Sequence, residues 1–249
     1  ASTLKDINPE LDLIVINEYL EADKAAEVLG GYKIDFLVDA IDTLSPKLHL
    51  IKYCMDNGIP LVLYDRPCPS LKCDQGVSDD YTGAFNAVEY LIQTGRKRIM
   101  YLSSSIQLEV SRRRYQGWRD ALLRYHMPIL DSMMVECDTR AKAIVALPNI
   151  MQGDNRPDAI FCVNDDCAAG VLHVAKLMGI KVPEDLSICG FSDAPVCHAT
   201  SPMLTTVQQH GAEIGKRAMA RLLKRLDGDE RIQQTEMVPT DLIVRETTM

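Results

Sequence analysis

The sequence predicts an α/β protein in which parallel sheets are covered by helices on both faces. Three observations lead to this class. Short strand-like runs recur along most of the chain, stretches with apolar residues at helical spacing separate them, and the strands are continuously apolar rather than alternating. Strands of that kind are buried on both faces, so we expect helices above and below each sheet.

The predicted elements follow one another in a regular order. Strands are expected over 11–17, 34–41, 60–65, 98–103, 133–138, 159–163 and 186–191. Apolar residues at helical spacing, such as Ala84, Val88 and Leu91, predict helices over 45–58, 81–95, 112–125, 140–152, 165–179 and 210–228. A single sheet of this many strands would be large. Two α/β lobes facing a cleft are therefore the simpler architecture.

Two stretches between or after these elements need an interpretation. The segment 66–76 is rich in proline and polar residues, which predicts a linker. The final helix has an apolar stripe and a basic face, which we interpret as solvated rather than as a DNA contact. The basic residues are Lys216, Arg217, Arg221, Lys224 and Arg225.

Composition limits the classes of function. The 249 residues, 47% of them hydrophobic, are enough for a sizeable core. A net charge of −8 and a pI near 5.2 disfavour a broad phosphate-binding face. No apolar run approaches the roughly 18 to 20 residues that span a bilayer, and the start of the sequence lacks a secretion signal. We expect a cytoplasmic protein.

Residue patterns for catalysis and metal binding are missing from the sequence. The eight cysteines lie mostly in apolar runs without C-x-x-C spacing, which predicts buried thiols. The five histidines form no metal-binding pattern, and no nucleophile elbow, P-loop or G-x-G-x-x-G motif occurs. We therefore expect neither a metal, a cofactor nor catalytic residues, and hence a protein that is not an enzyme.

Two acidic pairs, 79–80 and 165–166, each precede a predicted helix. Paired carboxylates can serve as general acid and base. Asp at the start of a helix more often caps free backbone N–H groups and suits the helix dipole. We interpret both pairs as caps, one member of which can also contact a ligand.

Four polar residues are better suited to binding a small molecule. Asn164 and Asp193 directly follow two apolar strands of one strand–helix–strand unit, so they are expected at adjacent strand ends. Arg114, near the start of a helix, offers a planar fork of donors for vicinal hydroxyls or a carboxylate. Gln209 lies where the chain passes between lobes. A local hydrogen bond is the alternative for each, but their common location indicates a ligand site. Trp118 is interpreted as a core residue.

Several segments resemble the effector-binding region of LacI/GalR-type bacterial transcription regulators. They are DDYTGAFNAVEYLIQTGRKRIMYL, SRRRYQGWRDAL, 156–206, TTVQQHGAEIGKRAMARLL and PTDLIVRETT, and they span residues 65–249 in the family's order. The resemblance implies two lobes of the periplasmic-binding-protein type joined by three crossings. The expected lobes are 1–95 plus 210–236 and 96–209 plus 237–249.

The resemblance also implies a function and its residues. Arg114, Asn164, Asp193 and Gln209 match the family's effector-binding positions, although Ser192 replaces the first acid of the usual G-F-D-D turn. Such regulators bind a sugar- or nucleoside-like effector between the lobes of a homodimer and so change operator binding. The family's N-terminal helix-turn-helix has no counterpart in this sequence, so operator DNA would be bound through a domain outside it.

Residues 1–63 are similar to ThiF/MoeB-type adenylating enzymes. This second resemblance assigns Mg-ATP binding to Asp42, but the glycine-rich loop and cationic residues of those enzymes lie upstream of anything in this sequence. It implies that the chain is a chimera of two α/β proteins, or a fragment of such an enzyme without activity. The alternative is a divergent regulator whose first segment only resembles the enzyme.

Overall fold

A computed structural model describes residues 24–34, 44–68, 71–153 and 155–248. The chain divides into two compact units, residues 1–61 with 225–228 and residues 62–224 with 229–249. The described part of the first unit contains helices α2 (Ala25–Leu29) and α3 (Leu44–Asp56). Helix α3 agrees with the helix predicted over 45–58. The strand predicted over 11–17 and nearly all of that over 34–41, together with Asp42, lie outside the described residues.

The main sheet of the second unit has six strands in the order β4-β3-β5-β6-β7-β9. All neighbouring pairs are parallel except β7 and β9, which are antiparallel. The strands are β3 (Ile99–Ser103), β4 (Met134–Glu136), β5 (Ala159–Cys162), β6 (Ser187–Ser192), β7 (Thr205–Gln208) and β9 (Asp241–Ile243). The four predicted strands in this region are confirmed. The apolar runs of β3, β5 and β6 are buried, whereas the edge strand β4 is only partly buried.

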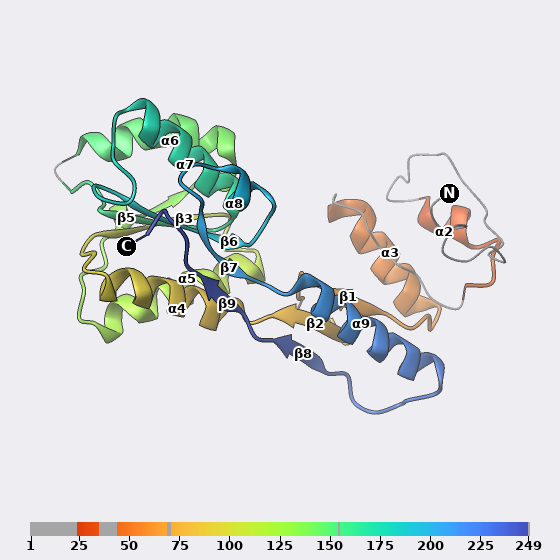
Figure 1. The fold of residues 1–249 in the computed structure, drawn as a ribbon. Helices are drawn as coiled ribbons and strands as arrows, with labels where there is room; N and C mark the ends of the chain where they lie inside the picture. The colour runs from red at the N-terminus through yellow and green to blue at the C-terminus, as the bar shows by residue number, and fades with distance from the viewer. Residues whose placement is uncertain (1–23, 35–43, 69–70, 154, 249) are drawn as a thin grey trace. The chain divides into compact units, whose positions relative to one another are not determined.

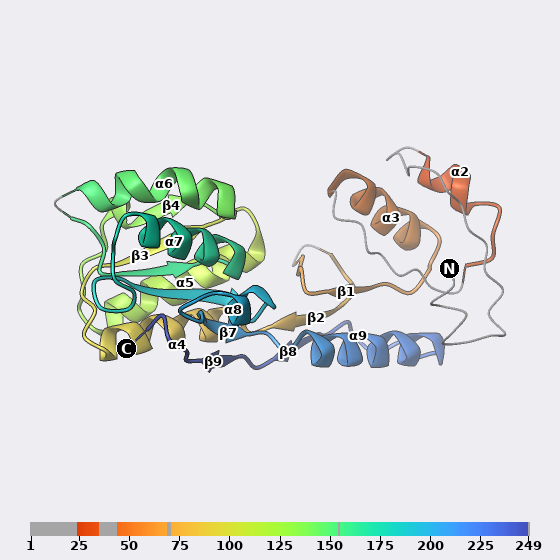
Figure 2. The ribbon, with the colours of Figure 1, turned by 45° about the horizontal axis from the view of Figure 1, so that its top comes forward.

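Helices cover both faces of this sheet, with α6 and α7 on one face and α4 and α5 on the other (Figures 1 and 2). They are α4 (Asp80–Gln93), α5 (Glu109–Arg124), α6 (Arg140–Gln152) and α7 (Asp165–Leu177). Helices α4 and α5 touch closely at Gly117, where a Cβ atom would collide with the backbone of Tyr81. Trp118 is 1% exposed, so its interpretation as a core residue is confirmed.

The second sheet has three parallel strands in the order β1-β2-β8. They are β1 (Val62–Tyr64), β2 (Asp74–Ser78) and β8 (Thr235–Val238). Helix α9 (Gly211–Leu226) packs on β2, where a Cβ atom at Gly76 would meet the Ala218 side chain at 3.2 Å. The end of the predicted linker is therefore wrong, because residues 74–76 belong to the central strand of this sheet.

One basic residue of α9 also differs from expectation. Arg221 is 4% exposed and forms an ion pair with Asp74 of β2 at 2.9 Å, so it is not part of a solvated face. The carboxylate offsets the cost of burying the guanidinium. Arg217 is half-exposed beside Glu213, as expected for a solvated helix surface.

The chain crosses between the two sheets three times, at residues 78–80, 208–211 and 238–241. These crossings are bound to one another. The Asp79 amide donates to the Val238 carbonyl at 2.9 Å, and Gln209 Nε2 donates to Ser78 Oγ at 2.9 Å. The predicted architecture with three crossings is confirmed.

The first crossing comes earlier than the predicted lobe boundary after residue 95. Helix α4 buries Ala84, Val88 and Leu91 in the core of the six-stranded sheet. This apolar stripe needs the face of that sheet for burial, so α4 packs on the six-stranded sheet.

Two short helical segments complete the second unit, η1 (Asp131–Met133) and α8 (Val196–Ala199). Across the residues that the structure describes, no helix combines the length and apolarity required to cross a membrane.

Candidate effector site

The four predicted binding residues lie at one edge of the six-stranded sheet. Strands β3, β5, β6 and β7 are mutually parallel, so their carboxyl ends meet at this edge. Asn164 and Gln209 come just after β5 and β7, and Asp193 directly follows β6. Arg114 reaches the same edge from α5, because its Nη1 donates to the Val163 carbonyl at 2.6 Å. In α/β sheets, ligands bind at such strand ends.

Arg114 is held mainly by Asp80, the first residue of α4. Its Nε and Nη2 atoms donate to Asp80 Oδ1 at 2.8 and 2.7 Å. Both side chains are nearly buried, with 8% and 1% exposure. The helix begins at Glu109, so Arg114 lies in its second turn rather than at its start. The bonds to Asp80 and Val163 use three of the five guanidinium N–H groups.

One carboxylate oxygen of Asp80 makes no hydrogen bond to a described residue. This atom, Oδ2, is buried. Burial raises the pKa of Asp80, and the adjacent Arg114 charge opposes that rise. A buried acceptor without a partner costs free energy, on the order of 1–3 kcal/mol. Asp80 Oδ2 and the remaining Arg114 donors can therefore bind a ligand hydroxyl as acceptor and donors.

An aromatic ring packs against one face of the Arg114 guanidinium. The Arg114 guanidinium carbon lies 3.7 Å from the centre of the Phe191 ring, in cation–π geometry. Phe191 belongs to β6 and is completely buried. The ring and the Asp80 carboxylate fix the guanidinium plane, so its donors point in a defined direction.

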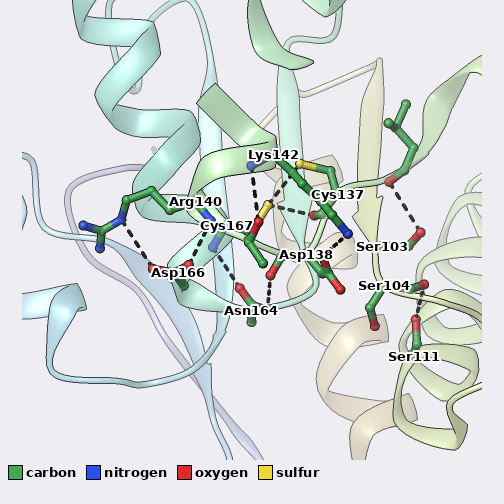
Figure 3. Close-up of polar contacts among 12 residues, drawn as sticks. Ser103, Ser104, Ser111, Cys137, Asp138, Arg140, Lys142, Asn164, Asp166 and Cys167 are labelled. Carbon is green, nitrogen blue, oxygen red and sulfur yellow. Dashed lines mark hydrogen bonds and ion pairs between the residues drawn. The ribbon is translucent and has the colours of Figure 1, made fainter. Parts of the chain in front are cut away.

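Asn164 acts as the N-cap of α7 (Figure 3). Its Oδ1 accepts from the Cys167 amide at 2.8 Å, and its Nδ2 donates to the Asp138 carbonyl at 2.8 Å. These bonds leave one N–H and one lone pair of the amide for a ligand. Asn164 therefore makes the local hydrogen bonds that were the alternative to ligand binding. Its effector-binding role stays a prediction.

Asp193 lies in a turn with unusual backbone geometry. Ser192 and Asp193 both have positive φ angles, 117° and 54°, which non-glycine residues rarely adopt. Asp193 Oδ1 accepts from Arg245 Nη2 at 2.7 Å. Asp165 fixes the turn from the other side, since Oδ2 accepts from the Ala194 amide and Oδ1 from the Thr206 hydroxyl, at 2.8 and 2.6 Å. Strained turns held by their surroundings occur at binding sites.

A hollow of 440 Å³ lies beside this turn, between the ends of β6 and β7 and the first turn of α9. Small-molecule sites have volumes of about 300–1,000 Å³. The lining residues are predominantly polar. They are Ser192, Asp193, Gln208, His210, Gly211, Ala212, Glu213 and Lys216.

The acidic pairs divide between capping and tertiary contacts. Asp79 caps α4, since its Oδ1 accepts from the Thr82 amide at 3.1 Å. Asp166 accepts from the Arg140 amide at 2.8 Å (Figure 3). Asp80 and Asp165 are buried and bind side chains across the fold instead. The capping interpretation is therefore right for Asp79 and wrong for the two buried members.

The sequence interpretation missed three residues that organise the site: Asp80, Asp165 and Arg245. Asp80 and Asp165 were interpreted as caps, because a carboxylate before a helix has that role by default. Arg245 follows the apolar run of β9. Its bond to Asp193 could not be predicted from a local pattern, because the two residues are 52 positions apart in the sequence. Its segment, LIVRETT, is nevertheless among those that carry the family resemblance.

Two buried cysteines, Cys137 and Cys167, lie beside Asn164. All eight cysteines are free, and seven are buried. Cys137 and Cys167 have their sulfur atoms 3.9 Å apart (Figure 3). Burial raises the pKa of Cys73 to about 11 and that of Cys197 to about 12, so these thiols are protonated at neutral pH. In the described ranges of the chain, no three His, Cys, Asp or Glu residues are grouped as a metal site requires.

Comparison with known proteins identifies the class. Residues 88–248 match the family model described as "Periplasmic binding protein-like domain", and the chain belongs to this family. Its relatives are LacI-type regulators. The E. coli transcriptional repressor CytR is 33% identical over 190 residues, which cover 76% of this chain and 56% of CytR. The chain thus spans little more than half of that relative.

Solved structures agree with this class. The cellobiose complex of the transcriptional regulator CelR superposes with a TM-score of 0.80 at 25% identity, covering 91% of this chain and 69% of that one. A LacI-family regulatory protein from Chloroflexus aggregans gives a TM-score of 0.80 at 26% identity, covering 94% and 84%. The matched region is the effector-binding region of LacI-type regulators.

The resemblance of residues 1–63 to adenylating enzymes has no support in these comparisons. The match to the C. aggregans regulator covers 94% of the chain, which is more than residues 62–249 alone can provide. The alignment with LacI-type structures therefore extends into the first segment. This agrees with the alternative of a divergent regulator rather than a chimera.

Proposed function

We propose that this chain senses a small polyhydroxylated effector, a sugar or a nucleoside, and that it does so as part of a LacI-type transcriptional regulator in the cytoplasm. The observation that carries the proposal is the unpartnered Asp80 Oδ2 beside the Arg114 guanidinium, two of whose five N–H groups are not used by the bonds to Asp80 and Val163. Vicinal hydroxyls both donate and accept, so they match a carboxylate oxygen next to guanidinium N–H groups.

The neighbouring residues fit the same ligand chemistry. Asn164 has one donor and one acceptor position left, and Asp193 lines the hollow beside the ends of β6 and β7. Gln209 can supply a further amide contact from the second crossing. The related regulator CelR was solved in complex with cellobiose, which supports the sugar class.

The regulator that we propose is a homodimer and is not an enzyme. CytR and the Vibrio PurR proteins are named HTH-type transcriptional repressors, and the chain spans only 56% to 58% of their lengths. Operator DNA would be bound by a domain that corresponds to the rest of those relatives. This agrees with the net charge of −8, which suits a sensor better than a phosphate-binding surface. Effector and operator binding would then be linked reciprocally.

The lobes of the sensor follow the two sheets of the second unit. We assign the three-stranded sheet with α9 to one lobe and the six-stranded sheet with α4 to α8 to the other. The boundaries then lie in the three crossings, 78–80, 208–211 and 238–241.

A ligand screen followed by a variant tests the proposal. A thermal-shift screen with pentoses, hexoses, sugar phosphates and nucleosides identifies the effector class, because a ligand that binds only the folded protein raises its stability. We expect Arg114→Ala to weaken binding of that effector by about 1.5–3 kcal/mol in calorimetric titration.

Two controls separate binding from folding. Arg112→Ala removes an exposed arginine of the same helix that pairs with Glu109, and it should leave affinity unchanged. Arg114→Lys keeps the charge beside Asp80 but loses the planar fork, so it should still weaken binding. An Arg114→Ala protein that is folded and binds with wild-type affinity would exclude the assigned role.

A further inference from the structure

A second cavity, of 160 Å³, opens at the opposite end of the six-stranded sheet from the candidate effector site. Its apolar wall comes from three elements: Ile99 at the start of β3, Leu122 of α5 and Met133 of η1. All three side chains are nearly buried, and Leu130 adds apolar surface at the rim. The cavity is thus an apolar space on the amino-terminal side of β3.

Two cationic residues, Lys97 and Arg98, line the same cavity. Among the residues that the structure describes, Asp158 is the only carboxylate bonded to this segment, and it accepts from the backbone amides of both residues at 2.8 to 3.1 Å. Arg98 Nε donates to the Arg156 carbonyl at 2.8 Å. Among the described residues, neither Lys97 Nζ nor the two Arg98 Nη atoms have a partner. Within the described part of the chain, two cationic side chains therefore border an apolar cavity and neither forms an ion pair.

The size of the cavity limits what can enter it. An apolar cavity of about 150 Å³ in another protein takes up one benzene molecule. A volume of 160 Å³ is thus suited to a single six-membered ring. Because the cations lie at the same cavity, a ring that carries a carboxylate satisfies both its apolar wall and its charge.

We propose that this cavity binds an aromatic monocarboxylate, with the ring against Ile99, Leu122 and Met133 and the carboxylate at Lys97 and Arg98. The site is separate from the effector site and does not depend on the function proposed above. It lies at the first residue of β3, whereas the effector site lies beyond the last residues of the parallel strands.

The protein contains its own reporter for this site. Trp118 is the only tryptophan, and its indole Nε1 donates to the carbonyl of Ile99 at 3.1 Å. Ile99 lines the cavity, so a ligand in contact with it changes the surroundings of the indole. We expect a saturable change in tryptophan fluorescence when the full chain is titrated with benzoate.

Matched ligands and variants define the test. Benzyl alcohol keeps the ring without the charge, and acetate keeps the charge without the ring; both should bind at least about tenfold more weakly than benzoate. Lys97→Gln with Arg98→Gln should raise the benzoate dissociation constant at least about tenfold, which corresponds to ~1.4 kcal/mol. Lys176→Gln, an exposed lysine of α7, is the control for net charge and should leave it unchanged.

A second variant tests the cavity itself. Met133→Phe adds volume to the wall and should abolish the fluorescence change, while urea unfolding shows whether the variant is folded. Gln209→Ala, at the effector site, should bind benzoate normally, so failure of one site is distinguishable from failure of the other. The proposal is overturned by a non-saturable signal, by equal affinity for benzyl alcohol, or by wild-type affinity in the double glutamine variant.

Discussion

Two buried arginine–aspartate pairs, one in each sheet of the second unit, have similar burial and different surroundings. Arg114 and Asp80 are 8% and 1% exposed, and Arg221 and Asp74 are 5% and 1% exposed. In the second pair, Asp74 Oδ1 accepts from Arg221 and also from the Gln234 amide, both at 2.9 Å. The Asp80 carboxylate has instead an oxygen without a partner.

We interpret the second pair as structural and propose a binding role for the first. Arg221 lies within 4 Å of two further carboxylates, those of Asp229 and Glu236, so its charge is balanced inside the fold. It connects α9 to β2 and β8. The Arg114 pair lies at the strand ends, and in the function that we propose a ligand hydroxyl would bind its unpartnered Asp80 oxygen. Burial does not distinguish the two pairs, and each has one buried atom without a hydrogen bond, Arg221 Nε and Asp80 Oδ2. The pairs differ in their surroundings, because the Glu236 carboxylate lies 3.8 Å from Arg221 Nε and helps to balance its charge.

The largest effect is expected from breaking the structural pair. Arg221→Met leaves the Asp74 carboxylate buried without its cation, and we expect the free energy of unfolding to fall by about 3–5 kcal/mol in urea titrations. Effector affinity of the folded fraction should not change. Arg217→Met is the matched control, since its half-exposed pair with Glu213 contributes at most about 1 kcal/mol. Equal losses in the two variants would mean that Arg221 is not structural.

A change at the binding pair should affect affinity and its pH dependence. Burial raises the pKa of Asp80, as does the charge of Asp65, while Arg114 opposes the shift. A ligand hydroxyl donates to the ionised carboxylate, so effector affinity should fall as the pH is lowered through this raised pKa. That fall should begin above the ordinary aspartate value of 3.8.

Asp80→Asn should weaken binding at neutral pH by about 1.5–3 kcal/mol and remove this pH dependence. Calorimetric titration over a pH series measures both quantities. If the variant retains the wild-type profile, another group is responsible for the titration and Asp80 does not face the effector.

The smallest effect is expected at two helix caps on the same sheet edge. Asn164 caps α7, and Thr139 caps α6 by accepting from the Lys142 amide at 3.3 Å. Replacement of either residue by alanine should cost about 1 kcal/mol of stability. Only Asn164→Ala should also reduce effector affinity. Equal affinities in the two variants would restrict Asn164 to its capping role.

The sequence predicts four of the six strands of the larger sheet, β3 to β6, because each contains a continuous apolar run. It does not predict β7 or β9, whose residues TTVQ and DLI are short and partly polar. Strand β2 could not be predicted in this way, since its residues DQGVS include only one large apolar side chain. Its polar residues are buried because distant partners bind them. Asp74 pairs with Arg221, and the Gln75 amide exchanges two bonds of 3.0 Å with the backbone of Cys68. Partners of that kind are not visible in a local pattern.

In the candidate site, too, a local sequence pattern does not reveal the distant partners of a residue. The position of Asn164 and Asp193 at one strand edge follows from the alternation of strands and helices. Arg114 reaches this edge from the second turn of α5, and Gln209 follows a strand that the sequence does not predict. The partners of these residues do not follow from that alternation, because Asp80 and Arg245 come from the start of α4 and the segment after β9. Local rules assign Asp80 a capping role, and only the packing of α4 on α5 brings it to Arg114.

The bond between Gln209 and Ser78 joins the first two crossings directly. The Gln209 NH₂ group has two N–H donors, and the bond to Ser78 uses one of them. The second N–H can bind an effector while the contact with Ser78 is kept. An effector held by that second N–H would be linked through one side chain to two crossings whose bonded residues are 131 positions apart in the sequence.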